Sequence, residues 1–254
     1  VSEMEKRVVI TGLGAVTPLG NNVRDTWQAL CAGRSGIRNI TLFNAESFPT
    51  KIAGEVKHFD FNQWNGRSAD LLELGRNSHF ALQAVTEAAA DSGFQNGSIS
   101  PERIGIYFGA GDGGFNFVEY ASIVSDAIEN GNGVVNRESY FKNSVERLKP
   151  KAILEQEPYQ IVNHLAEVFH VEGPVSNCLT ACAASSQAIG EAADIIRRGE
   201  ADVMITGGTH SMIHPLGVAG FNLLTALSVK NESPERASRP FDRDRDGFVL
   251  SEGS

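Results

Sequence analysis

Short runs of β-branched and apolar residues alternate along the chain with longer segments of helical periodicity. The apolar runs, which we interpret as buried strands, are residues 7–12, 104–108, 175–178, 203–206 and 248–250, the last being only the start of a strand. Helical periodicity fills residues 22–32, 74–92, 181–198 and 216–227. This alternation predicts an α/β protein with a largely parallel sheet that is covered by helices on both faces.

Two of the helices carry clear signals at their ends. Asn22 is a typical amino-terminal cap, Asp25 stands at the capping-box position, and Gly33 follows the last turn. The helix over residues 74–92 places its apolar residues on one stripe and is followed by Gly93. Residues 35–70 have mixed periodicity and are expected to form loops with short elements.

The segment at about 115–169 is polar and helical, and it contains no convincing strand. We therefore predict one domain over residues 1–254, with this segment as an insertion between strands. The helix that follows residues 175–178 is different in composition. Between Thr180 and Ala193, ten of fourteen residues are Ala, Cys, Ser or Gly, so other backbone can approach this helix closely and we expect a central, buried helix.

Composition narrows the class of protein. With 254 residues and 41% hydrophobic residues, the chain can build one sizeable core. A net charge of −9 disfavours binding to nucleic acid and to anionic membranes. No apolar run approaches the roughly 18 residues of a membrane span, and the charged first residues are unlike a signal sequence. We expect a soluble protein of the cytoplasm.

Cys182 is the most informative residue, because it falls where a predicted strand ends and a predicted helix begins. Unpaired N–H groups at a helix start favour an anionic thiol and can bind a developing oxyanion, and both features suit acyl transfer. The alternative is that Cys182 is only a small core residue, which is common for cysteine and is our interpretation of Cys178. Three cysteines are too few for a disulfide framework and indicate a reducing compartment.

Four ordered segments resemble the β-ketoacyl synthase family, the elongation-type (type II) condensing enzymes of the thiolase superfamily. Residues 180–186 (TACAASS) resemble its active-site signature, and residues 8–20 resemble its opening strand and loop. Residues 201–208 resemble the strand after the nucleophile helix, and residues 239–249 resemble a late loop and strand. These segments extend over nearly the whole chain.

The resemblance implies a thiolase-like layered α-β-α fold, as the amino-terminal half of a pseudo-duplicated architecture. It implies a β-ketoacyl-[acyl-carrier-protein] synthase of fatty-acid or polyketide synthesis, in which Cys182 takes an acyl group from carrier protein before a decarboxylative condensation with malonyl-carrier protein. Gly111, Asp112 and Gly113 would border the acyl pocket, and Phe221 would line the approach to the cysteine unless it only packs in the core. Acyl carrier protein and a homodimer or heterodimer partner are implied, without a cofactor or metal.

Three departures from the family pattern matter. Two catalytic histidines and a lysine of the family belong to a carboxy-terminal half absent from these residues, so this chain alone is expected not to catalyse condensation. Asp112 stands where relatives carry an apolar or small residue, and a carboxylate disfavours an apolar acyl chain. Thr225 replaces an arginine that grips the acidic carrier, and the basic residues Arg147, Lys149 and Lys151 are candidates to replace it.

Two alternatives remain open. One is a non-catalytic subunit that sets chain length in a synthase heterodimer, although such subunits usually lack the cysteine. The other is a thiolase-like enzyme that uses coenzyme A esters, which the late motifs disfavour.

Three ligand-site patterns fail on their details. The glycine-rich residues 109–114 lack the second strand and acid of a dinucleotide site. The acidic run 242–247 has its only nearby glutamate, Glu252, one position early for a calcium loop. His210 and His214 are spaced like a zinc pair, but no glutamate base accompanies them, so we interpret them as surface or packing histidines.

Overall fold

The computed structural model describes residues 6–254 except 64–70, 72, 96, 112–115 and 129–132. At its centre, the described strands β4 (Val175–Cys178), β3 (Ile104–Ala110) and β5 (Val203–Thr209) lie in that order in one parallel sheet. Ile106 of β3 stands in register with Ile205 of β5. Parallel strands need crossover connections, which helices supply here, so the alternation of apolar and helical segments is confirmed as a fold signal.

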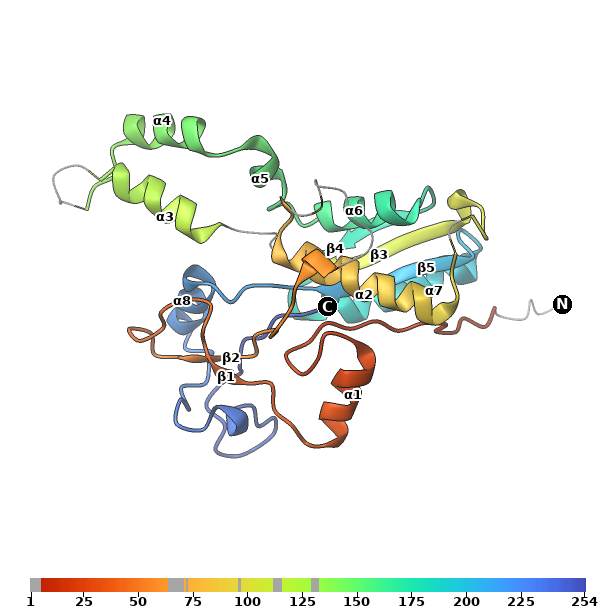
Figure 1. Ribbon diagram of the computed structural model, residues 1–254, viewed down its shortest axis with the longest axis horizontal. Helices are drawn as coiled ribbons and strands as arrows, with labels where there is room; N and C mark the ends of the chain where they lie inside the picture. The colour runs from red at the N-terminus through yellow and green to blue at the C-terminus, as the bar shows by residue number, and fades with distance from the viewer. Residues whose placement is uncertain (1–5, 64–70, 72, 96, 112–115, 129–132) are drawn as a thin grey trace.

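Helices cover both faces of this sheet (Figure 1). α7 (Ala184–Arg198) connects β4 to β5 and packs on one face. α2 (Arg76–Ser92) and α6 (Gln160–Phe169) pack against each other and cover the other face. The result is an α-β-α layered unit, which confirms the predicted fold class.

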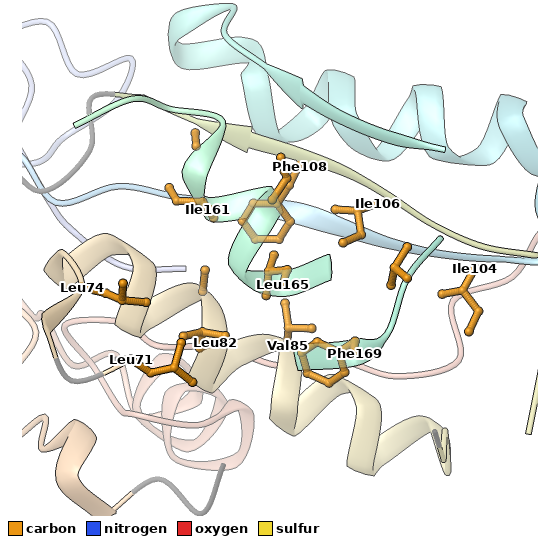
Figure 2. Packing of buried hydrophobic residues seen from close by; sticks show 14 of the residues in the cluster. Leu71, Leu74, Leu82, Val85, Ile104, Ile106, Phe108, Ile161, Leu165 and Phe169 are labelled. Atoms are coloured by element: carbon orange, nitrogen blue, oxygen red, sulfur yellow. The ribbon is translucent and has the colours of Figure 1, made fainter. Parts of the chain in front are cut away.

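The main hydrophobic core lies between the sheet and the pair α2 and α6 (Figure 2). Phe108 of β3 points toward Leu165 of α6, and α2 contributes Leu82 and Val85 to the same cluster. β3 is buried on both faces, as expected for a central strand of a parallel sheet. Each large apolar side chain buried in this way contributes about 1.5–3 kcal/mol, so the core fixes the sheet on which the candidate site is built.

The helix ends that the sequence marks with Asn22, Gly33 and Gly93 are confirmed. α1 (Val23–Cys31) begins at Asn22, whose Oδ1 accepts the N–H of Asp25 at 2.8 Å. Gly33 follows α1 with φ of 65°, and Gly93 ends α2 with φ of 71°, a left-handed conformation that glycine adopts without steric cost. None of the helices in the described ranges has both the length and the apolar composition to cross a membrane.

A second, smaller core lies beside the layered unit. It brings together β1 (Arg38–Asn39), β2 (Ile52–Ala53) and α8 (Pro215–Leu223) around buried apolar residues. The region has the loops and short elements that the sequence predicts. α8 ends earlier than predicted, because Thr225 adopts a positive φ of 52°. Single 3-10 turns are found at Phe61–Gln63, Pro101–Arg103 and Pro234–Arg236.

The helices between β3 and α6 extend away from the sheet as an arm (residues 116–128 and 133–154 as described; Figure 1). α3 (Phe117–Asp126) and α4 (Arg137–Arg147) pack together, and α5 (Pro150–Leu154) leads back toward the core. α6, which lies in the segment predicted as an insertion, contributes to the main core.

Arg147 holds the arm together. Its Nε donates to Glu119 at 2.8 Å, its Nη1 to Asp126 at 2.6 Å and its Nη2 to Ser122 at 2.8 Å. This residue is one of the basic side chains suggested above for carrier-protein docking. Its guanidinium is committed to two carboxylates of α3, so it is a poor candidate for that task.

The predicted first strand is wrong as a buried strand. Residues 7–12 form no ladder with any described strand, and Val9 and Ile10 are 64% and 76% exposed. A cavity of about 370 Å³ separates this segment from β5, with residues 8–14 on one side and residues 203–208 on the other. Apolar composition alone does not make a strand, because a strand also needs a neighbouring backbone to bond with.

The predicted start of a final strand at residues 248–250 is also corrected. Phe248 makes an isolated bridge to Leu227, and Ser251 makes one to Gly54, but no ladder forms among the described residues. The end of the chain is nonetheless well connected. Gly253 exchanges backbone hydrogen bonds with His210 at 2.9 and 3.0 Å, and Ser254 exchanges two with Val16 at 2.8 and 2.9 Å.

Glu55 is a buried carboxylate that stabilises the small core region. It accepts hydrogen bonds from the N–H and Oγ1 of Thr41, both at 2.7 Å, from the N–H of Leu42 at 3.0 Å and from Lys57. Burial raises the pKa of Glu55, but these bonds outweigh it and the net pKa lies below 4.5. The folded state therefore favours the ionised carboxylate.

We expect Glu55→Gln to lower the free energy of unfolding by about 2 kcal/mol at pH 7, because hydrogen bonds to an ionised acceptor are lost. Since the folded pKa is depressed, this contribution is complete above pH 4.5 and is lost as the pH falls through the folded pKa. Urea unfolding of both proteins between pH 3 and 7 checks this. A difference that stayed constant over that range would contradict it.

Candidate active site

Cys182 lies at the junction between a strand and a helix. β4 ends at Cys178, a 3-10 turn covers Ala181–Ala183, and α7 begins at Ala184. The Cys182 thiol is free and exposed at the middle of that turn, whereas Cys178 is buried. The local placement predicted from the sequence is confirmed, since Cys182 is neither inside the helix nor enclosed in the core.

The backbone before Cys182 is in an unusual conformation. Ala181 has φ of 51°, in the left-handed region that residues with a Cβ rarely adopt. Such a conformation costs about 1 kcal/mol or more and persists only when surrounding contacts impose it. We call residues 179–183 the cysteine turn. Its tightness places Cys182 two residues before Ala184, the first residue of α7.

Hydrogen bonds link three side chains in and beside the cysteine turn: Cys178, Thr180 and Gln187. Thr180 Oγ1 donates to Gln187 Oε1 on α7 at 2.9 Å. Cys178 Sγ lies 3.3 Å from the same Thr180 Oγ1. Because the single hydroxyl hydrogen of Thr180 is directed at Gln187, the Cys178 S–H group is the donor in the second contact. The end of β4, the turn and the helix are thereby connected.

The start of α7 has no side-chain cap, since neither Thr180 nor Ala183 makes a side-chain cap bond. Backbone bonds hold the N–H group of Ala183, to Thr180 O at 3.2 Å, and that of Ala184, to Ala181 O. The first N–H groups of a helix have no partner within the helix, and they carry its positive dipole end. A thiolate or a developing oxyanion next to Cys182 would be stabilised by such groups.

Glycines let α7 rest directly on the sheet. A Cβ on Gly109 of β3 would stand 2.6 Å from the Ser185 backbone N, and one on Gly208 of β5 would stand 2.7 Å from the Ser185 Cβ. Both distances are shorter than real Cβ contacts allow. The close approach that the small residues predicted is thus present, and it fixes the height of the cysteine turn above the sheet.

The expectation of a central, buried helix is met on only one face of α7. A stripe of Ala184, Ala188, Ala192 and Ile195 is buried against the sheet. The opposite face is open, and Ile189 is 47% exposed. Small residues permit close packing on every side, but within the described residues only one side of α7 has a neighbour.

Of the other expected site residues, Gly111 and Phe221 lie in the described part of the structure. Gly111 follows β3, and a Cβ there would stand 2.8 Å from the His210 Nε2. Asp112 and Gly113 lie outside the described residues. Phe221 of α8 packs edge to face against Phe248, with ring centroids 5.3 Å apart, as part of the second core. Its described contacts are therefore those of core packing.

Sequence reasoning missed a buried ionic network around Glu252. Glu252 accepts two bonds from Arg76, at 2.7 and 3.0 Å, one from the Val56 N–H at 2.9 Å and one from Ser211 at 2.9 Å. It joins the end of the chain to α2 and to the segment after β5. The only signal in the sequence is a glutamate that stands two residues after the end of the short apolar run 248–250.

The residues of the rejected ligand patterns have structural roles. His214 caps α8, its Nδ1 accepting the Gly217 N–H at 3.2 Å. Asp246 accepts from Ser228 Oγ at 2.7 Å and from the Val229 N–H at 3.0 Å. Burial raises the pKa of Asp246, but these hydrogen bonds lower it by more, so the net pKa shift is downward. In the described part of the chain, no three His, Cys, Asp or Glu side chains are grouped to hold a metal ion.

Comparison with known proteins gives a consistent family. The model of the family described as "Beta-ketoacyl synthase, N-terminal domain" matches residues 5–254. The chain is 39% identical to the 3-oxoacyl-[acyl-carrier-protein] synthase 2 of Coxiella burnetii over 99% of its own length. It spans only 57% of that relative.

Solved structures agree with this match. A β-ketoacyl synthase from Burkholderia phymatum superimposes with a TM-score of 0.79 at 30% identity, over 98% of this chain and 57% of that one. The ishigamide ketosynthase/chain length factor superimposes with a TM-score of 0.80 at 27% identity, over 99% of this chain and 57% of that one.

Proposed function

Because the chain belongs to the β-ketoacyl synthase family and matches the amino-terminal domain of that family, we propose that it supplies the acyl-accepting cysteine of a 3-oxoacyl-[acyl-carrier-protein] synthase. The nucleophile is Cys182. The substrates are thioesters of acyl carrier protein, the substrate class that the name of the Coxiella relative contains. The product of the complete reaction is a β-ketoacyl thioester in fatty-acid or polyketide synthesis.

One observation carries this proposal. The thiol of Cys182 is exposed in the 3-10 turn between β4 and α7, next to helix N–H groups that no described side chain caps. Cys178 is buried and Cys31 lies on α1, away from any strand-to-helix turn. Of the three thiols, only Cys182 is both accessible and next to donors for an oxyanion.

The first half-reaction follows from this geometry. The Cys182 thiolate attacks the carbonyl carbon of the acyl thioester and forms a new carbon–sulfur bond. The negative charge moves to the carbonyl oxygen, where the N–H of Cys182 and the first turn of α7 would donate hydrogen bonds. Collapse of this intermediate breaks the bond to the carrier's thiol, which leaves as a thiolate and takes a proton from water.

The second half-reaction needs groups beyond residues 1–254. Loss of carbon dioxide from malonyl-carrier protein leaves a carbanion that attacks the carbonyl carbon of the acyl-enzyme, and the carbon–sulfur bond to Cys182 breaks with release of its thiolate. The enolate oxygen must be stabilised while the carbanion exists. In this family, two histidines and a lysine of the carboxy-terminal half do this. The chain spans 57% of the Coxiella relative, so we propose that these residues alone load an acyl group but do not condense it.

The acyl pocket is proposed from motif position. Gly111, Asp112 and Gly113 would border it, and Phe221 would line the approach to Cys182. The half-buried Gly111, which has room for no Cβ beside His210, supports a tightly built loop. A carboxylate at residue 112 would favour an acyl group that carries a polar or cationic substituent.

The assembly is proposed on the same basis. The open face of α7, with Ile189 exposed, would be covered by the carboxy-terminal half or by the partner in a homodimer or heterodimer. We place the enzyme in the cytoplasm, where carrier-protein thioesters and reduced cysteines occur together.

A second candidate function is a chain-length-setting subunit of a synthase heterodimer. The similarity to the ishigamide ketosynthase/chain length factor favours it. Such subunits usually lack the nucleophilic cysteine, whereas Cys182 is present and exposed. The catalytic assignment is therefore preferred.

Acyl loading distinguishes the two functions. The enzyme that contains this domain, incubated with acetyl-carrier protein, whose acyl group is too short to depend on residue 112, should gain the mass of one acetyl group per chain in intact-protein mass spectrometry. Unloaded carrier protein is the control and should add no mass. A chain-length-setting subunit would gain no acyl mass under the same conditions.

A further inference from the structure

The cysteine turn contains a strained residue whose conformation requires an explanation. Ala181 has φ of 51° although it carries a Cβ. The neighbouring Thr180 has φ of −105° and ψ of 40°, which is also outside the strand and helix regions. A free chain would relax to negative φ at Ala181, because the left-handed conformation is disfavoured there. Some contact must therefore hold the turn.

The described contacts point to Thr180 as the anchor. Its hydroxyl donates to Gln187 Oε1 at 2.9 Å and accepts from the thiol of Cys178 at 3.3 Å. The residue just before Ala181 is thus attached forward to α7 and backward to the end of β4. Two backbone bonds also hold the turn, one from the Ala183 N–H to Thr180 O at 3.2 Å and one from the Ala184 N–H to Ala181 O. The side-chain bonds of Thr180 add a restraint that links the turn to both β4 and α7.

We propose that Gln187 is a positioning residue for the nucleophile, acting through Thr180. It touches neither the reacting thiol nor the substrate. Its amide oxygen holds Thr180 against the first turns of α7, which keeps Ala181 left-handed and Cys182 at the helix start. This inference rests on the proposed function only in treating Cys182 as the nucleophile, because the effect of Gln187 on the thiol can be measured without any acyl substrate.

The orientation of the hydrogen bonds has a consequence for the other cysteine. The S–H group of Cys178 is occupied as a donor to Thr180, and its side chain is buried. Cys178 is therefore part of the restraint and is not a competing nucleophile. Two thiols four residues apart thus have different tasks, one in holding the turn and one in reacting.

The test uses matched pairs of substitutions that differ in one hydrogen bond. Thr180→Val removes the hydroxyl but keeps the β-branched shape, and Thr180→Ser keeps the hydroxyl. Gln187→Met removes the amide oxygen at nearly constant length, and Gln187→Glu keeps an acceptor in the same place. The readout is the rate of iodoacetamide alkylation at Cys182, divided by the rate at Cys31 in the same molecule, measured by peptide mass spectrometry.

Exposed Cys31 on α1 serves as an internal reference. We expect Thr180→Val and Gln187→Met each to lower the Cys182-to-Cys31 ratio about fivefold, the worth of roughly one neutral hydrogen bond. The double variant should lose little more than either single variant, because both remove the same bond. Thr180→Ser should retain the ratio to within about twofold.

A glycine at residue 181 provides a second, independent check. Glycine adopts positive φ without penalty, so Thr180→Val in an Ala181→Gly background should change the ratio less than it does alone. If Thr180→Ser is as slow as Thr180→Val, or if Gln187→Met leaves the ratio unchanged, the positioning role is wrong.

Failure of the positioning role and failure of the proposed function are distinguishable. If the unsubstituted enzyme gains no acyl mass but the alkylation ratio responds as expected, the proposed function is wrong and the role of Gln187 stands. If the enzyme is acylated and the ratio does not respond, the opposite holds.

Discussion

Cys182→Ala should abolish acylation of the enzyme by acyl-carrier protein, lowering the rate by about a thousandfold or more, as for loss of other catalytic nucleophiles. Alanine removes only the sulfur, so the cysteine turn and α7 remain in place and carrier binding should persist. The measurement is the rate of acyl mass gain, with carrier affinity determined separately. Loss of both would indicate misfolding and would not test the assignment.

The other cysteines supply matched controls. Cys31→Ala changes an exposed thiol on α1 and should leave acylation unchanged. Cys178→Ala removes a buried thiol that donates to Thr180, so it should slow acylation only modestly. Acylation of the Cys182→Ala protein at the original rate would contradict the nucleophile assignment.

Arg76→Met should lower the free energy of unfolding by about 3 kcal/mol, because it leaves the Glu252 carboxylate buried without its cation. The Glu252 side chain is fully buried and that of Arg76 is 34% exposed, which places the expected loss at the lower end for such pairs. Methionine keeps an unbranched apolar stem over the Phe80 ring, where the Arg76 guanidinium now lies 4.9 Å from the centroid. Urea unfolding measures the loss.

An exposed ion pair provides the control for this prediction. Arg198 pairs with Glu200 on the surface after α7, so Arg198→Met should leave the unfolding free energy unchanged within error. Arg76→Met/Glu252→Gln should recover part of the loss, since the uncompensated charge is gone. Equal effects of Arg76→Met and Arg198→Met would show that the buried network does not stabilise the fold.

Local signals in the sequence were sufficient for the elements that depend on local physics. The helix that begins at Asn22 and the one that ends at Gly93 form as expected, because a cap and a left-handed glycine act within one turn. The strands β3 and β5 were recognised from their apolar runs. Cys182 was placed correctly because a strand end and a helix start are both visible within a few residues.

Features that depend on distant partners could not be predicted in the same way. Residues 7–12 have strand composition but no described strand paired with them, and composition does not show whether a partner strand is present. Arg76 and Glu252 are separated by 176 residues, so no periodic pattern relates them. The hydrogen bond between Thr180 and Gln187 spans only seven residues, but it accompanies a left-handed conformation at Ala181. An alanine in the sequence does not predict that conformation.

The position of the acyl group after loading tests the central claim most directly. The enzyme should be loaded with acetyl-carrier protein, digested and sequenced by tandem mass spectrometry, in a Cys178→Ala background so that the peptide around the turn holds one thiol. We expect the acetyl mass on Cys182 and on no other residue. An acylated enzyme whose Cys182 peptide is unmodified would contradict the account.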